Sequence, residues 1–308
     1  RQNRMHVAGS HDGIRAVTFT LETPTVDDLD PVLEVLRAWQ VPDAPFQLHP
    51  GDVGWFWRTG AETTAASIRT WSRDGEHAAV GLLDGADLLR LAIAPDLQQD
   101  EGLAAQVVAD VGQPDRGVLP DGEVYVELPV GAHVREALGR DGWGSDEPWT
   151  VLQRDLSDPV EDPGLRVAVV GPELAPAWSE VHRAAFGTPL TAEAITERWH
   201  TLAGGPAFEE ARCLLGFDEH DNPVASIIAW SAGPGRVGLI EPMGAHPDHR
   251  GRGHGRAITV AAAAALQEMG ACAAAVATTT SNVGGVATYR SAGYAEIAQR
   301  LDRRREAA

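Results

Sequence analysis

A run of glycines and arginines stands between an apolar strand pattern and a helix pattern. It reads Arg250-Gly251-Arg252-Gly253-His254-Gly255-Arg256. Glycines permit tight backbone curvature, and successive amide N–H groups at a helix N-terminus point outward together, with the helix dipole behind them. Such a turn favours a phosphate or pyrophosphate, and the arginines add positive charge. We therefore expect an anionic ligand at this turn.

The composition narrows the kind of anion site. A dinucleotide fingerprint that starts at Gly251 needs glycine at position 256, where this chain has Arg256. All 25 basic residues are arginine. The absence of lysine excludes a Walker loop, a lysine Schiff base and pyridoxal phosphate chemistry. The net charge of −19 argues against a nucleic acid or an anionic membrane as the partner.

Two ordered motifs carry a resemblance to a known family. The turn fits the pattern Q/R-x-x-G-x-G/A, with Arg250, Gly253 and Gly255 at the fixed positions. Residues 282–294 read Asn-Val-Gly-Gly-Val-Ala-Thr-Tyr-Arg-Ser-Ala-Gly-Tyr, which resembles N-x-x-A-x-x-L-Y-x-x-x-G-F with three mild departures. Together the motifs resemble the GNAT superfamily of acyl-CoA-dependent N-acyltransferases over residues 165–300.

The resemblance implies how an acyl-CoA would lie on the chain. In the superfamily the strand before the turn splays from its neighbour, and the pantetheine arm lies in the gap, here along the backbone at Ala245. The Met243 N–H would then meet the thioester carbonyl and stabilise the oxyanion. The pyrophosphate would rest on the amides from Gly251 to Arg256, and Asn282 would contact or order the CoA arm.

The same resemblance supplies a general acid and leaves the general base open. Tyr289 occupies the position of the family's acid tyrosine. A phenol with a pKa near 10 can protonate a leaving thiolate. The structural alternative is a tyrosine that packs on the core. Glu241 shares a strand face with Met243 and is the first candidate for the base, although it could equally serve only the structure. The alternative bases are His182, His200, His246 and His249.

The elements that must position these residues occur twice. Arg15-Ala16-Val17 and Arg166–Val169 open apolar strand patterns 151 positions apart, and Gly142-Trp143 and Gly293-Tyr294 close helix patterns at the same offset. Each half runs strand, amphipathic helices, apolar strands, helix, strand, short helix and last strand. This order predicts an α/β (α+β) protein with two tandem GNAT-like domains, each a mixed, mostly antiparallel sheet flanked by helices.

Boundaries follow from the same patterns. We predict an N-terminal tail at 1–14, a first domain at 15–156, an acidic, proline-containing linker at 157–164 and a second domain at 165–308. In the second domain, strands are expected at 166–169, 213–217, 224–230, 237–245 and 271–279, and helices near 178–186 and 255–269. This tandem layout resembles two-domain members of the superfamily such as mycothiol synthase.

The first half is predicted to be a degenerate copy. Gln99, Gly102 and Ala104 match the turn pattern, but Asp100 and Glu101 stand where the second copy has Gly251 and Arg252, and two carboxylates would repel a pyrophosphate. Leu138 occupies the acid position, and Gly131 the asparagine position. We therefore expect catalysis only in the second half.

The leading hypothesis is an N-acetyltransferase that moves an acetyl or short acyl group from acyl-CoA to a primary amine of a small molecule, directly and in a ternary complex. Acetyl-CoA is the expected co-substrate. The alternatives are a non-catalytic acyl-CoA binding or sensing protein and a mycothiol synthase-like acetyltransferase. The acidic composition mildly favours a cationic acceptor. Two tryptophans lie on the helices that in this family flank the acceptor pocket. Trp178 is expected to pack in the core, and Trp199 could belong to the core or to the pocket.

Other features limit the chemistry and the setting. Cys213 and Cys272 fall in apolar strand patterns, which argues against an acyl-cysteine intermediate. Two cysteines, and histidines without paired spacing, predict no metal site. The sequence shows no apolar run long enough for a membrane span and no signal peptide, so a cytoplasmic protein without a membrane partner is expected. The oligomeric state stays open between monomer and homodimer.

Overall fold

The computed structural model describes residues 18–307. The predicted tail, and the strand expected at Arg15–Val17, lie outside the described residues. In the first half the helices and strands are β1 (Thr20–Glu22), α1 (Leu29–Ala38), α2 (Pro50–Phe56), α3 (Ala61–Ser67), β2 (Ile68–Arg73), β3 (Glu76–Leu83), β4 (Leu88–Ile93), α4 (Glu101–Gly112), β5 (Val124–Glu127), α5 (His133–Arg140) and β6 (Gly144–Asp155).

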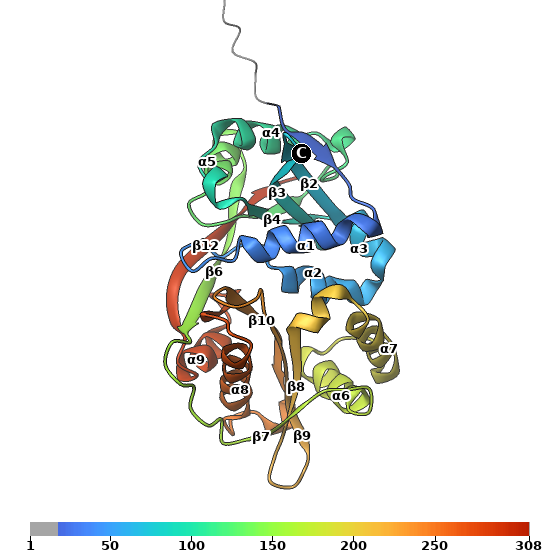
Figure 1. Ribbon diagram of the computed structural model, residues 1–308, viewed down its shortest axis with the longest axis vertical. Helices are drawn as coiled ribbons and strands as arrows, with labels where there is room; N and C mark the ends of the chain where they lie inside the picture. Colours follow the sequence, from blue (N-terminus) through green and yellow to red (C-terminus); the bar gives the residue numbers. More distant parts are fainter. Residues whose placement is uncertain (1–17, 308) are drawn as a thin grey trace, which may run out of the picture.

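The second half repeats this order (Figure 1). Its elements are β7 (Arg166–Val169), α6 (Ala175–Phe186), α7 (Ala192–Ala203), β8 (Ala211–Phe217), β9 (Pro223–Trp230), β10 (Val237–Ala245), α8 (His254–Glu268), β11 (Ala273–Thr279), α9 (Val283–Ser291) and β12 (Ala295–Arg305). The predicted fold class, a mixed and mainly antiparallel sheet flanked by helices in two successive copies, is confirmed. The predicted bounds of β7 and β10 agree with the structure.

The two copies share one sheet. Twelve strands follow the order β1-β2-β3-β4-β5-β12-β6-β11-β10-β9-β8-β7, in which only β4–β5 and β10–β11 are parallel pairs. The last strand of each half pairs with the other half: β12 lies beside β5, and β6 lies beside β11. β6 and β12 also pair with each other at the centre of the sheet. The copies are therefore joined by a reciprocal exchange of strands.

The exchange of β6 and β12 affects the domain boundary that the sequence predicts at residues 157–164. Those residues form no helix or strand, but the strand before them pairs with β11 from Ala273↔Asp155 to Thr279↔Trp149. Within the linker, Glu161 forms ion pairs with Arg154 and Arg256. The domain limits stay a prediction from the sequence, because each half completes the sheet of the other.

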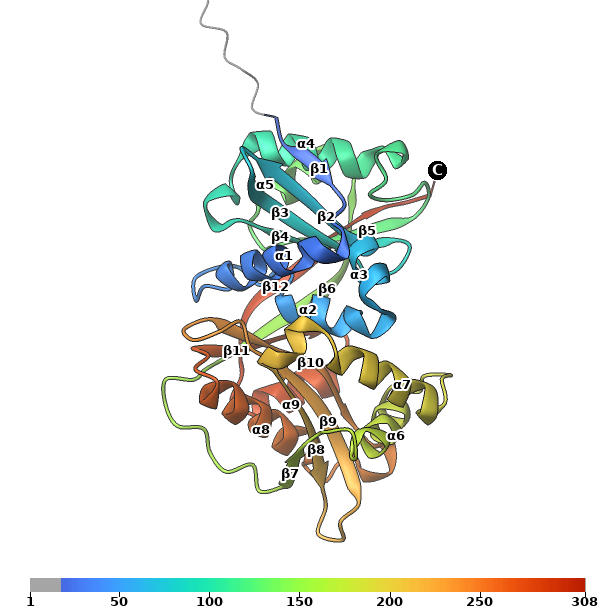
Figure 2. The ribbon, with the colours of Figure 1, turned by 45° about the vertical axis from the view of Figure 1, so that its right-hand side comes forward.

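The halves also share a hydrophobic core. Leu29 and Leu33 of α1 belong to the same buried cluster as Trp178 of α6 and Trp230 of β9. Helix α2 approaches Trp230 closely because Gly51 lacks a side chain: a Cβ there would stand 2.5 Å from the indole. Figure 2 shows α1 and α2 in the layer between the sheet of the first half and the helices of the second. Within residues 18–307, no helix is long and apolar enough to cross a membrane.

Candidate active site

The parallel pair β10–β11 opens into a wedge. The two strands pair only from Val237↔Ala273 to Leu239↔Ala275, although β10 continues to Ala245. The rest of β11 stays paired with β6. In β10 the register with β9 shifts between Ile240 and Met243, and such a bulge bends a strand away from its neighbour. The wedge is therefore built by a local irregularity at residues 241–242.

The backbone of β10 alternates between the wedge and β9. The His246 N–H donates to the Val224 carbonyl on the β9 side at 2.9 Å. Because the polar groups of successive strand residues face opposite edges, those of Met243 and Ala245 face the wedge. Arg250 Nε donates to the Ala245 carbonyl at 3.4 Å, which agrees with this direction. Both backbone positions predicted from the resemblance thus lie along the open edge.

The glycine and arginine turn connects β10 to α8. Gly251 and Gly253 have φ values of 76° and 82°, a region that favours glycine. Gly253 is the N-cap of α8 and makes no side-chain cap. The first amides of α8 therefore have no capping side chain as a partner, as an anion-binding helix terminus requires.

The three arginines of the turn differ in what they contact. Arg250 also donates to the Ala185 carbonyl at 3.1 Å, and Arg256 donates to the Ser291 carbonyl at 2.9 Å. Arg252 is exposed and forms no hydrogen bond or ion pair with any described residue. Burial lowers the pKa of His254, with added repulsion from His249 and Arg252. Of the predicted arginines, Arg252 alone has its guanidinium entirely available to a ligand.

A cavity of about 670 Å³ adjoins this turn. The residues that line it include Arg252, Gly253, His254 and Arg256 of the turn, together with Arg166, Phe217, Asp218 and Glu219. Its volume falls in the range of small-molecule sites. The turn therefore faces open space large enough for part of a nucleotide.

Asn282 has a structural role at the start of α9. Its Oδ1 accepts a hydrogen bond from the Gly285 N–H at 3.1 Å, and its Nδ2 donates to Thr278 Oγ1 at 3.0 Å. A Cβ at position 285 would stand 2.4 Å from Asn282 Nδ2, so the glycine at this departure from the family pattern leaves room for the cap. Asn282 fixes the helix that carries Tyr289.

Tyr289 is buried, and the charge of Glu241 acts on its phenol. Tyr289 is 7% exposed, in the cluster against which Met243 packs. Burial raises the pKa of the phenol, and the negative charge of Glu241 raises it further. The hydroxyl therefore stays protonated at and above neutral pH, as a general acid must. The Glu241 side chain is 37% exposed.

Sequence reasoning missed the first-half residue that meets Glu241. Arg90 of β4 lies 3.8 Å from the Glu241 carboxylate, and it also pairs with Asp52 at 3.0 Å and Glu127 at 3.3 Å. Arg90 stands 151 positions before Glu241, so the repeat offset was a signal that could have found it. The corresponding positions of the two copies thus meet at their junction.

The other candidate bases and nucleophiles lie in less suitable places. His200 is exposed, and His249 is 3.8 Å from Asp218 on the β8–β9 turn. Both cysteines are free thiols; burial raises the pKa of Cys213 to about 12. Within residues 18–307 no group of three histidine, cysteine or acidic side chains is placed to hold a metal ion.

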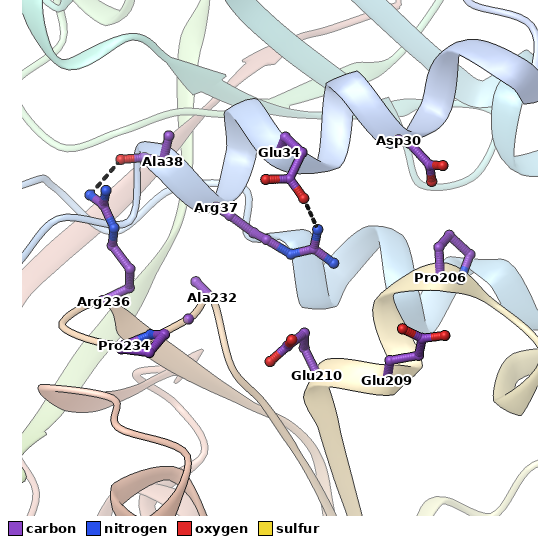
Figure 3. Close-up of a pocket in the computed structure, with 11 residues that line it drawn as sticks. Asp30, Glu34, Arg37, Ala38, Pro206, Glu209, Glu210, Ala232, Pro234 and Arg236 are labelled. Carbon is purple, nitrogen blue, oxygen red and sulfur yellow. Dashed lines mark hydrogen bonds and ion pairs between the residues drawn. The ribbon is translucent and has the colours of Figure 1, made fainter.

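A larger cavity, of about 740 Å³, lies elsewhere at the junction between the halves (Figure 3). Asp30 and Glu34 of α1 face Glu209 and Glu210 of the second half across it. Its Arg37 is paired with Glu34 at 2.5 Å. None of the predicted site residues lines this cavity, so its size does not make it the candidate active site.

The tandem sheet thus places a splayed parallel strand pair beside an uncapped helix terminus, as the resemblance implied. Residues 175–294 match the family described as the acetyltransferase (GNAT) family. The match covers most of the second half of the chain, so this half carries a domain similar to the acetyltransferase (GNAT) family, whose members generally use acetyl-CoA as co-substrate. No curated protein matches the sequence.

Solved structures share the fold over both halves of the chain. A GCN5-related N-acetyltransferase from Sphaerobacter thermophilus is 20% identical, with 94% of this chain and 95% of that chain covered and a TM-score of 0.58. A tandem GNAT protein from the clavulanic acid biosynthesis pathway is 15% identical, with coverages of 94% and 99% and a TM-score of 0.62. A GNAT-family acetyltransferase from Colwellia psychrerythraea is 15% identical, with coverages of 93% and 99% and a TM-score of 0.56. These likenesses confirm the two-domain fold.

Proposed function

We propose that the second half transfers an acetyl or short acyl group from acyl-CoA directly to a primary amine of a small molecule. The observation that carries the proposal is the wedge between β10 and β11, which ends at the uncapped N-terminus of α8. One unbroken surface thus offers strand backbone groups for a pantetheine arm and helix amides for a pyrophosphate. The first half has no such role in this proposal.

In the proposed complex the acyl-CoA lies along β10. The Ala245 backbone pairs with the pantetheine arm, and the amides of residues 251–256 hold the pyrophosphate with help from Arg252. The Met243 N–H donates to the thioester carbonyl, where negative charge develops as the amine attacks. A preorganised donor of this kind is worth about 100- to 1000-fold in rate in other acyl-transfer enzymes.

The chemical step forms a C–N bond and breaks the C–S bond. Glu241 takes one proton from the acceptor ammonium, directly or through water, and Tyr289 gives its proton to the departing CoA thiolate. The amine nitrogen loses its second proton as the amide forms, and this proton restores the phenol of Tyr289. The effect of the Glu241 charge on the pKa of Tyr289, and the packing of Met243 against the cluster that contains Tyr289, support this pair of roles. Both groups would then lie beside the same thioester.

The proposal is tested by initial rates with acetyl-CoA and a panel of primary amines, with release of free CoA thiol as the readout. Direct transfer requires plots at varied acetyl-CoA to intersect, because both substrates must be bound together. The double variant Cys213→Ala with Cys272→Ala should keep its activity, since a buried thiol of raised pKa is a poor nucleophile. Parallel lines, with loss of activity in the double variant, would show an acyl-cysteine route instead.

A further inference from the structure

A cavity of about 180 Å³ lies where α6 and α7 meet the first half. Its walls combine four aromatic side chains with aliphatic ones, and two arginines line it. The main side chains are Trp55, Arg58, Trp178, His182, Arg198 and Trp199. The first two belong to the segment that ends α2, which packs against α7 (Figure 1). Both halves of the chain therefore build this cavity.

The aromatic side chains hold one another in place. His182 stacks on Trp178 with ring centroids 4.9 Å apart and an angle of 10° between the planes, and it lies 5.5 Å from Trp55. Burial lowers the pKa of His182 to about 4, with a further contribution from the charge of Arg58. The imidazole is thus neutral near pH 7, and the positive charge of the cavity comes from the arginines.

Arg58 is fixed in position yet lacks a counter-ion. Its Nη1 donates to the Trp55 carbonyl at 2.7 Å, and its guanidinium carbon lies 4.3 Å from the centre of the Trp55 ring. Neither Arg58 nor Arg198 forms an ion pair with any residue that the structure describes. Burial lowers the pKa of Arg58; the negative charge of Asp84, which forms no ion pair with it, opposes this shift, and the positive charge of Arg198 adds to it. Two neighbouring guanidinium groups without a carboxylate partner favour an anion between them.

The cavity leads toward the proposed transfer site. His182 lies 4.7 Å from the ring of Phe186, and a Cβ on Gly244 of β10 would stand 3.0 Å from that phenyl ring. Gly244 directly follows Met243. The negative charge of Glu241 acts on Arg58 as well. The aromatic contacts of α6 thus extend from the cavity wall at His182 through Phe186 to β10.

We propose that this cavity binds the acceptor and selects an amine that also carries a carboxylate or similar anion on an aromatic or compact apolar body. This inference rests on the proposed function, because it names the acceptor class for that reaction. An apolar cavity of about 150 Å³ is known to hold a benzene ring, so 180 Å³ suits a single ring. The aromatic walls pack on the ring, and the anion binds Arg58 and Arg198. The negative net charge of the whole chain had favoured a cationic acceptor, and the cavity's own side chains favour the opposite.

The test uses three probes of one shape that differ in charge: 4-(aminomethyl)benzoate, benzylamine and 1,4-bis(aminomethyl)benzene. Binding to the full chain in the presence of CoA is followed by tryptophan fluorescence and calorimetry, and acetylation by release of free thiol. The benzoate should bind at least tenfold more tightly than benzylamine, and the diamine most weakly. The kcat/KM values for the three amines should follow the same order as their affinities.

Matched variants assign the effect to the arginines. Arg58→Gln and Arg198→Gln should each weaken the benzoate about tenfold and change benzylamine little. Arg183→Gln, on an exposed ion pair of α6 outside the cavity, is the control for loss of one positive charge. Arg198 is exposed, so its variant should fold even if Arg58→Gln does not.

The outcomes separate this inference from the transferase proposal. Equal affinity for the three probes, or a preference for the diamine, overturns the anion-selective cavity, whether or not acetylation occurs. Tight, arginine-dependent binding of the benzoate without acetylation of any amine supports the cavity and overturns the proposed reaction. Acetylation of the benzoate that is lost with either arginine supports both.

Discussion

The two turns that lead into α4 and α8 occupy the same place in the two copies but treat the helix terminus differently. At α4, the Asp100 side chain accepts a hydrogen bond from the Leu103 N–H at 2.7 Å, and Glu101 follows in the first turn. At α8, Gly253 takes the cap position and offers no side chain. One copy satisfies its helix amides with its own carboxylate. The other leaves them for a ligand, and α8 starts at His254, two positions later in the 151-residue register than α4.

The divergence continues at the positions proposed for chemistry. Leu138 and Arg90 stand 151 residues before Tyr289 and Glu241. Leu138 is fully buried in the core of the first half, and Arg90 joins a network with Asp52 and Glu127. In the first copy, one of these positions therefore packs in the core and the other forms ion pairs. In the first copy, the segment with Trp55 and Arg58 also lines the cavity formed with α6 and α7 of the second copy.

The largest effect of any single substitution is expected for Gly253→Asp. This change gives α8 a capping carboxylate in the role that Asp100 has at α4, although the sequence counterpart of Gly253 is Gly102, so we expect loss of acetyl-CoA binding by about 1000-fold or more. Calorimetric titration of the wild type should give one site per chain. Saturation at a hundredfold excess over the dissociation constant should stabilise the fold by about 2.7 kcal/mol.

Gly253→Asn separates charge from backbone strain. Asparagine tolerates the left-handed conformation at φ 82° better than most residues and carries no charge, so it should retain much more affinity than aspartate. Two equivalent CoA sites in the wild type would contradict the prediction that the first copy does not bind CoA. Equal losses of acetyl-CoA affinity in Gly253→Asp and Gly253→Asn would show that the charge of the aspartate does not cause the loss.

The next largest effect is expected for Tyr289→Phe. Loss of the phenolic proton donor should lower turnover about 100-fold while acetyl-CoA affinity changes little, because the ring still packs. Tyr294→Phe is the matched control: its hydroxyl is also buried, has no hydrogen-bond partner among the described residues, and has a pKa raised by burial. Equal turnover in the two variants would remove Tyr289 from the mechanism.

Much of the second half could be predicted from the sequence because local patterns determine it. The strand at 237–245, the turn and the helix that starts at His254 follow from apolar periodicity and glycine placement. The exchange of β6 and β12 could not be predicted, since alternation in a strand indicates which face is buried but does not name its partner. The same holds for Arg90 at Glu241 and for Arg58 beside Arg198, which depend on how two distant segments pack.

Glu241→Gln should have the smallest effect, and one that depends on pH. A primary amine with a pKa near 10 is almost wholly protonated at pH 7, so a base contributes most at low pH and loses importance as pH rises toward that value. We expect about a tenfold lower kcat/KM near pH 6 to 7, and a difference that narrows steadily to pH 9. The measurement is the ratio of wild-type to variant kcat/KM across this range.

The control for Glu241→Gln is Glu209→Gln, which removes the same charge from the acidic cavity of Figure 3, away from the predicted site residues. It should leave the pH profile unchanged. A wild-type to variant ratio for Glu241→Gln that stays constant with pH would mean that the carboxylate acts through its ion pair with Arg90 and positions the junction between the copies. In that case the proton would have to leave through another group, and His182, neutral near pH 7 beside the acceptor cavity, would be the first to substitute.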